Sequence, residues 1–245
     1  MCMLFGFSAV RKYELNKCLS EFFKFSSHHP HGWGLAIQNE VNNCPMIWKE
    51  AKAAYRSEML KELLNESIPG KLAIAHIRYA TAGEIKYVNT HPFIRNIENT
   101  EWTLAHNGSI SCPALNKIVT EPYGETDSEK VFCYLSQALR NTKYDIEMLE
   151  EKIKYIAAFG KLNLIFSDGR NLYIHINYRD SLYMYKGKDY VCFCTKPIDN
   201  ILRNNKWEAV SLNKLLIYRD GIKIYEGKQH RHEYFNKDFK GRRVI

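Results

Sequence analysis

The chain has 245 residues, 45% of them hydrophobic, and a formal net charge of +8 at pH 7. This length allows one large domain or two small ones, and the apolar content suits a globular protein with a sizeable core. No stretch approaches the roughly 18 consecutive apolar residues that a membrane helix needs. The apolar N-terminus lacks the preceding basic segment and the small-residue cleavage site of a signal peptide, so none is expected.

Cysteine usage and charge distribution narrow the class of protein further. The seven cysteines are odd in number and scattered, which argues against a disulfide framework and favours a reducing cytoplasmic location. The basic residues are also spread out, and the densest run, residues 237–243, is short. The charge therefore indicates a solvated surface or a general preference for anions. We expect no nucleic-acid partner and no membrane partner.

The first half of the chain is predicted to mix strands and helices. Residues 3–8 are apolar and aromatic, which is typical of a buried strand. Apolar residues recur with helical spacing over 13–24, and Ser57 is a suitable cap for a helix over 57–65. Further strands are predicted at 33–37, 45–49, 71–77 and 102–106.

The second half is predicted to contain two helices and then strands. Thr126 and Glu129 have the spacing of a capping box, so a helix should begin there, and another is predicted over 146–158. No repeat or flexible linker interrupts the chain. We therefore expect a single α+β domain over 1–245, with two sheets, a helical layer and a polar tail at 235–245. Strand-like runs follow the helices at 162–166, 172–176, 182–185, 190–195, 209–212, 215–218 and 222–225.

Cys2 is the first candidate for a chemical role. It follows the initiator Met1, and because cysteine is small, we expect Met1 to be removed. Cys2 would then carry a free α-amine, a group whose ordinary pKa is about 7.7–8.0. A nucleophile paired with the N-terminal amine is a known form of activated nucleophile. The alternative is a cysteine that is simply buried in the first strand.

Three further features have the character of an amide-hydrolase site. The Asn107 amide and the Gly108 backbone N–H could donate to an oxyanion, although Asn-Gly is also the commonest hairpin pair. Arg78 follows a strand and carries a planar fork suited to a carboxylate. Asp127 begins a helix and could hold an ammonium group, although acidic residues are common there without any such role. Together these side chains could bind an α-amino acid and place its side-chain amide against a thiol.

The histidines give no metal site in this interpretation. His28, His29 and His31 lie close together, but their spacing matches no closed zinc pattern and no cysteine or carboxylate is near them in the sequence. We expect neither a metal nor an organic cofactor.

Six motifs stand in order along the chain: Met1-Cys2 with Gly6, HGWGLA (31–36), AHIRYATAG (75–83), NTHPF (89–93), LAHNGSI (104–110) and ETDSE (125–129). Taken together, they resemble class II glutamine amidotransferases, which are N-terminal nucleophile (Ntn) hydrolases. The resemblance covers about the first half of the chain. The later segments Cys194–Pro197, Trp207 and 215–221 resemble the end of the stand-alone branch. This family implies a four-layer αββα sandwich with two mainly antiparallel sheets.

The resemblance also implies a role for each matching residue. Cys2 would be the nucleophile and its amine the base, while Asn107 and the Gly108 backbone would form the oxyanion hole. Arg78 would bind the substrate α-carboxylate and Asp127 the α-amino group. Thr81 and Tyr79 would line the glutamine pocket. We expect His76, His91 and His106 to be structural or to support the site from behind.

The motifs also depart from the family pattern in places. His31 stands where this branch often has Asp, Tyr79 where many relatives have Trp or Lys, and Ala82 where others have His or Val. These departures concern the finer specificity of the pocket.

The implied reaction forms a γ-glutamyl thioester on Cys2, which water hydrolyses to glutamate with release of ammonia or an amine. The substrate would be glutamine or another γ-glutamyl amide. The resemblance is compatible with a homo-oligomer and with a separate partner protein that uses the ammonia. Two alternatives stay open. One is a γ-glutamyl peptide hydrolase in thiol metabolism, and the other is a non-catalytic amino-acid-binding module.

Overall fold

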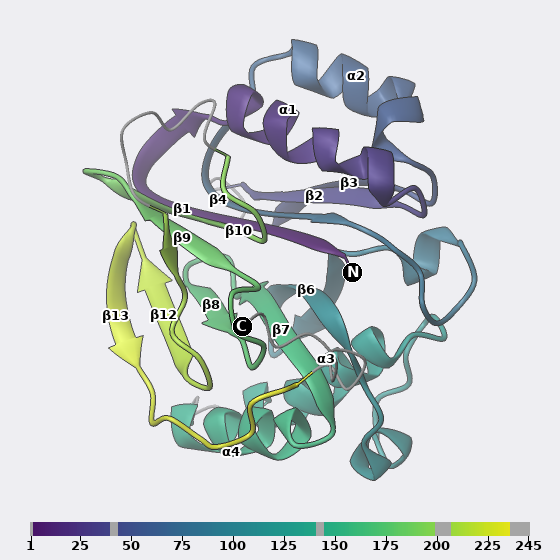
Figure 1. Ribbon diagram of the computed structural model, residues 1–245, viewed down its shortest axis with the longest axis vertical. Helices are drawn as coiled ribbons and strands as arrows, with labels where there is room; N and C mark the ends of the chain where they lie inside the picture. Colours follow the sequence, from purple (N-terminus) through teal and green to yellow (C-terminus); the bar gives the residue numbers. More distant parts are fainter. Residues whose placement is uncertain (1, 40–43, 141–144, 199–206, 236–245) are drawn as a thin grey trace, which may run out of the picture.

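The computed structural model describes residues 2–39, 44–140, 145–198 and 207–235, so Met1 and nearly all of the expected polar tail lie outside the described residues. These segments form two stacked antiparallel sheets with a helical layer outside each (Figure 1). The α-helices are α1 (Asn16–Lys24), α2 (Glu58–Asn65), α3 (Asp127–Leu139) and α4 (Ile146–Ala157).

The first sheet has seven strands in the order β11-β9-β10-β1-β4-β2-β3, and α1 and α2 cover its outer face (Figure 1). Its central strand β1 pairs with β10 on one side and β4 on the other. The strands are β1 (Met3–Glu14), β2 (Trp33–Gln38), β3 (Pro45–Glu50), β4 (Pro69–Ile77), β9 (Tyr183–Lys186), β10 (Tyr190–Cys194) and β11 (Glu208–Ala209).

The second sheet has six strands in the order β13-β12-β8-β7-β6-β5, and α3 and α4 lie on its outer side (Figure 1). The four layers are therefore helices, sheet, sheet and helices, as predicted. The strands are β5 (Phe93–Ile97), β6 (Thr100–Ile110), β7 (Gly160–Ser167), β8 (Leu172–His175), β12 (Leu215–Arg219) and β13 (Ile222–Glu226).

Three buried hydrophobic clusters hold the layers together. One lies between the first sheet and α1 and α2, and a second between the other sheet and α3 and α4. The third joins the sheets to each other, with Leu4 and Ile74 from the first sheet against Ala105 and Ile165 from the second. Gly6 belongs to this interface, because a Cβ atom there would lie 3.1 Å from Ile165 Cγ2. The sheets therefore meet through close side-chain packing.

The main elements agree with the sequence predictions, with four corrections. The 13–24 helix was predicted too long, because β1 continues to Glu14 and α1 begins at Asn16. The predicted 102–106 strand was too short, since β6 runs on to Ile110. The prediction missed β5, and β11 occupies only Glu208–Ala209 of the region where a longer strand was expected.

Half of the predicted capping box is present at the start of α3. The Thr126 side chain caps the helix by accepting from Glu129 N at 3.2 Å. The Glu129 carboxylate does not return this contact. It accepts instead from the backbone N–H groups of Tyr123 and Gly124 and pairs with Arg95 at 3.0 Å, inside the protein. Glu129 therefore anchors the loop before α3.

Candidate active site

A cavity of about 260 Å³ opens where Cys2, at the start of β1, faces β6 and β7 of the other sheet. Five residues of its lining were predicted from the sequence, and they come from three separate segments of the chain. The lining residues are Cys2, Tyr79, Thr81, Asn107 and Gly108, which were predicted, and Ser109, Lys161, Tyr178 and Tyr234, which were not.

The Cys2 thiol is held by the backbone of Tyr79, the second residue after β4. Its Sγ accepts from Tyr79 N at 3.3 Å and lies 3.5 Å from the Tyr79 carbonyl oxygen. Burial raises the pKa of the thiol above its ordinary value, while the Tyr79 hydrogen bond and the charges of Lys161 and Arg78 act in the opposite direction. The thiol is therefore protonated at neutral pH and needs a base before it can attack.

Asn107 and Gly108 lie within β6, where they pair with Asn163 and Leu162 of β7. The hairpin-turn alternative for this Asn-Gly pair is therefore wrong, because the strand continues through it. The Asn107 side chain is 2% exposed, and its Nδ2 has no hydrogen-bond partner among the described residues. A buried amide N–H without a partner is costly, so this one is suited to an acceptor that arrives with a ligand.

Glycine is the only residue type that fits at position 108. A Cβ atom there would lie 1.8 Å from the Lys161 carbonyl oxygen and 2.5 Å from His106 Nε2. The backbone of β6 therefore runs close to β7 at the floor of the cavity, beside the Asn107 amide.

Arg78 directly follows β4 and is 3% exposed, but it does not line the Cys2 cavity. Its guanidinium donates to the carbonyl oxygens of Ala82, Gly83 and Glu84 at 3.0, 3.2 and 2.9 Å. Its observed contacts therefore fold the 82–84 loop over a buried positive charge.

Asp127 lines a neighbouring cavity of about 360 Å³. Its Oδ2 accepts from Ile110 N at 2.7 Å, and its Oδ1 accepts from Ser128 N at 2.9 Å. The two cavities are lined by consecutive residues on two walls, Thr81 then Ala82 and Ser109 then Ile110. The cavity that Asp127 lines is therefore next to the thiol cavity.

His76, His91 and His106 lie together behind the site and are fully buried. The centres of the His76 and His91 rings are 4.2 Å apart. The two ring nitrogens of His106 contact Ser128 Oγ and the Lys161 carbonyl oxygen. Burial lowers the pKa of all three, to about 3 for His76. They do not line the cavity, and a structural or supporting role stays a prediction.

His31 likewise supports the site. Its Nδ1 accepts from Ala80 N at 2.9 Å and its backbone N–H donates to Arg78 O at 3.2 Å. The residue thereby fixes the turn that presents Tyr79 and Thr81. No group of three or more His, Cys, Asp or Glu residues among the described residues could hold a metal ion.

No motif in the sequence points to Lys161, Tyr178 or Tyr234. Lys161 reaches the site because β7 pairs with β6, and Tyr178 follows β8 by three residues. Tyr234 comes from the segment after β13, where its backbone N–H donates to Asn177 O. The centre of its ring lies 5.6 Å from the centre of the Tyr178 ring. Only the pairing of distant segments brings these side chains to Cys2.

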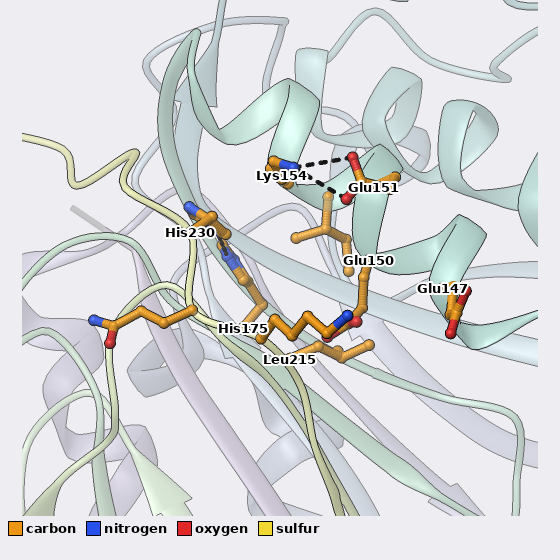
Figure 2. Close-up of a pocket in the computed structure, with 10 residues that line it drawn as sticks. Glu147, Glu150, Glu151, Lys154, His175, Leu215 and His230 are labelled. Carbon is orange, nitrogen blue, oxygen red and sulfur yellow. Dashed lines mark hydrogen bonds and ion pairs between the residues drawn. The ribbon is translucent and has the colours of Figure 1, made fainter.

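A second pocket, of about 320 Å³, lies among α4, β8 and the segment after β13 (Figure 2). Its two histidines face each other, with His175 Nε2 3.0 Å from His230 Nε2. His175 Nδ1 lies 3.0 Å from Leu162 O, and His230 Nδ1 accepts from His232 N at 3.2 Å. Because a carbonyl only accepts, His175 donates through Nδ1 and His230 must donate to His175.

All four ring nitrogens in this pocket are therefore used within the protein. Burial lowers the pKa of His175 to about 3 and that of His230 to about 4, so both rings are neutral near pH 7. The pair therefore anchors the segment that carries Tyr234 to β8.

Comparison with known proteins gives matches over most of the chain. A family model described as class-II glutamine amidotransferases matches residues 1–190. An uncharacterized protein of Methanocaldococcus jannaschii is 32% identical, over 94% of this chain and 72% of its own length. A Haemophilus influenzae protein, provisionally named as a glutamine amidotransferase, is also 32% identical, over 71% of this chain and 63% of its own length. The match therefore spans less than two thirds of that second relative.

Solved structures confirm the predicted fold. The glutamine phosphoribosylpyrophosphate amidotransferase of Bacillus subtilis matches 93% of this chain and 49% of its own, with a TM-score of 0.67 and 18% identity. The crystal structure of a predicted glutamine amidotransferase from Pseudomonas aeruginosa matches 91% of this chain and all of its own, with a TM-score of 0.62 and 20% identity. No α-helix among the described residues is both long and apolar enough to span a membrane.

Proposed function

The chain belongs to the class II glutamine amidotransferases, and from that premise we propose that it hydrolyses a γ-glutamyl amide through a thioester on Cys2. One observation carries the proposal: Cys2 lines the same cavity as Asn107, whose buried Nδ2 has no hydrogen-bond partner among the described residues. A nucleophile opposite a buried donor is the arrangement that amide hydrolysis requires.

The first step forms the thioester. The α-amine of Cys2, freed by removal of Met1, takes the thiol proton, and the sulfur attacks the amide carbon of the substrate. The resulting oxyanion accepts hydrogen bonds from Asn107 Nδ2 and the Gly108 backbone N–H. The C–N bond then breaks as the protonated amine passes its proton to the leaving nitrogen, which departs as ammonia or an amine.

The second step releases the acid. Water attacks the thioester carbon, its proton passes to the Cys2 amine, and the same donors hold the second oxyanion. When the C–S bond breaks, the proton returns to sulfur and glutamate leaves. The raised pKa of the thiol makes the amine necessary, because little thiolate would otherwise be present at neutral pH.

The α-amino-acid end of the substrate would extend toward Asp127. Each Asp127 oxygen accepts one backbone hydrogen bond and keeps room for another, so the carboxylate can also hold an ammonium group. Arg78 would attract the α-carboxylate from beneath the 82–84 loop. Its guanidinium has five N–H groups and donates to three carbonyl oxygens among the described residues, so donors remain for a carboxylate. Thr81 and Tyr79 would border the chain of the substrate between the two ends.

The test is the intact mass of the purified protein before and after reaction with 6-diazo-5-oxo-norleucine, a glutamine-like electrophile. We expect loss of Met1 and one adduct on Cys2. Cys2→Ala should remove the adduct and all amide hydrolysis, while the exposed Cys44→Ala should keep both. Retained hydrolysis in Cys2→Ala, or an adduct that moves to another cysteine, would rule out the proposal.

A substrate with a group beyond the amide nitrogen is a second candidate. It is favoured by the aromatic wall that Tyr178 and Tyr234 add to the cavity. Such a wall suits the apolar part of a γ-glutamyl peptide or amine. The ratio of kcat/KM for a γ-glutamyl dipeptide to that for glutamine measures this preference, and Tyr234→Ala should lower the ratio. A ratio that stays the same would favour free glutamine as the substrate.

A further inference from the structure

Lys161 is a buried lysine on the wall of the Cys2 cavity. It lies on β7 and is 6% exposed. Its Nζ donates to Asn107 Oδ1 at 3.2 Å and lies 5.0 Å from the centre of the Tyr178 ring. Burial of an ammonium group costs free energy unless the group is well placed, so this position calls for a reason.

The contact with Asn107 determines which way that amide points. An ammonium group has donors and no acceptor, so the Asn107 atom that faces it must be the oxygen. The amide nitrogen then lies on the other side, where its N–H groups have no partner among the described residues. Without a charged donor at this position, the two flipped orientations of the amide would be much closer in energy.

We propose that Lys161 is a positioning residue for the oxyanion hole: its ammonium group holds the Asn107 amide so that Nδ2 faces the oxyanion that forms on the substrate. This inference rests on the proposed function. Lys161 acts through Asn107, and its positive charge also favours the Cys2 thiolate. A hydrogen bond to the amide oxygen polarises the amide and makes its N–H a stronger donor.

The charge of Lys161 is retained at neutral pH and lost just above it. Burial lowers its pKa to about 8, against a smaller opposing effect of Cys2. As the pH rises through 8, the ammonium group becomes an amine and its hold on Asn107 weakens. The free amine of Cys2 must lose its own proton to act as a base, which sets the acid side of the profile. The titratable groups that line the cavity or contact Lys161 are Cys2, Tyr79, Tyr178, Tyr234 and His106.

The test compares Lys161→Met with a matched control elsewhere. Lys152 has the same kind of surroundings: its Nζ donates to Gln137 Oε1 at 3.3 Å and lies 4.2 Å from the centre of the Tyr134 ring. We expect Lys161→Met to lower kcat by about 10- to 100-fold, less than the loss of an oxyanion donor. The KM should change by less than about threefold, because substrate binding does not use this contact. Lys152→Met should match the wild type.

The pH profile provides a readout that a purely structural role would not move. In the wild type, kcat should fall above about pH 8, and Lys161→Met should lose this alkaline decline. In Lys161→Arg the decline should shift upward, because guanidinium keeps its proton. If Lys161→Met melts below the assay temperature, this shift in Lys161→Arg decides the question. An unchanged kcat in Lys161→Met, an effect on KM alone, or an unmoved decline in Lys161→Arg would overturn the inference.

The two proposals fail in different ways. If wild-type protein forms no adduct on Cys2 and hydrolyses no γ-glutamyl amide, the proposed function is wrong. If it does both and Lys161→Met behaves like Lys152→Met, only the role of Lys161 is wrong.

Discussion

Asn107 and Asn163 face each other across the β6–β7 ladder but have opposite surroundings. Asn163 uses both ends of its amide: Nδ2 donates to Ser181 Oγ at 2.8 Å, and Oδ1 accepts from Asn177 N at 3.3 Å. Within the described part of the chain, Asn107 uses only its amide oxygen, and its Nδ2 has no partner there. The amide of Asn163 is therefore satisfied by the fold, whereas that of Asn107 keeps a donor for a ligand.

This difference predicts different kinetic outcomes for two alanine variants. Asn107→Ala should lower kcat by about 100-fold or more, as for loss of an oxyanion donor. It should also lower the free energy of unfolding by about 1–3 kcal/mol, because the buried Lys161 ammonium group loses an acceptor. Asn163→Ala should lower the free energy of unfolding by about 1–3 kcal/mol, because it leaves buried partners unsatisfied. Steady-state kinetics and urea unfolding of both variants measure this. Equal kinetic losses in the two would contradict the assigned roles.

Single residues differ in how far the sequence reveals them. Cys2, Asn107, Gly108, Tyr79 and Thr81 stand in local motifs, and they line one cavity as expected. Lys161 stands in no motif, and it reaches Asn107 only through a contact that spans 54 positions of the chain. The sequence placed Arg78 and Asp127 correctly at a strand end and a helix start. It gave no indication that backbone groups already occupy part of each charged side chain.

At the scale of elements, β6 decides the shape of the site. The Asn-Gly pair has the strongest local preference for a hairpin turn, and yet the strand continues to Ile110. Pairing with β7 over eight consecutive positions outweighs that preference. A propensity that belongs to two residues cannot include this cooperative pairing, so β6 was predicted too short.

The close approach of β6 and β7 makes Gly108→Ala a test of this element. The added methyl would overlap the Lys161 carbonyl oxygen, so the strands must separate. We expect a loss of about 3 kcal/mol or more in the free energy of unfolding, together with loss of activity. Thr103→Ala, buried on the same strand, adds no atoms and should cost less than about 2 kcal/mol. Urea unfolding compares them, and similar losses would count against the overlap.

At the scale of the whole molecule, buried neutral histidines make stability depend on pH. Burial lowers the pKa of His76 and His175 to about 3 and that of His91 well below its ordinary value. In the unfolded chain these groups protonate near pH 6.5. The contribution of the neutral histidines to the free energy of unfolding is therefore complete above pH 6.5 and is lost as the pH falls from there toward 3. Each histidine adds a slope of up to about 1.4 kcal/mol per pH unit.

The variant His91→Phe tests how much His91 contributes to this pH dependence of stability. His91 packs 4.3 Å from the Phe93 ring centre, and neither of its nitrogens has a partner among the described residues. A phenyl ring should therefore pack in its place and change the stability at pH 7 by less than about 1.5 kcal/mol. Unfolding in urea at pH 7.5, 6.5 and 5.5 should show a shallower decline than in the wild type. An identical decline would mean that His91 takes up its proton in the folded protein over the same pH range as in the unfolded chain.

The overall layering was predictable because each layer has its own local signal. Alternating strands, helix caps and the ordered motifs pointed to two sheets between helices, and the structure has this arrangement. The segment after β13 had no such signal, since its place depends on His230 meeting His175 and on Tyr234 meeting Asn177. Contacts of this kind exist only once the two sheets are assembled.

The tight packing of Gly6 against Ile165 has a consequence for recombination between relatives. The proposed nucleophile precedes a strand of one sheet and the proposed oxyanion donors lie in the other, so their alignment depends on the face where the sheets meet. A chimera that joins the first half of this chain to the second half of a relative would inherit every reacting group. Its compatibility would still be decided by the fit at Gly6 and Ile165. When chimeras are made from members of this family, the residues at positions 6 and 165 should therefore be exchanged together.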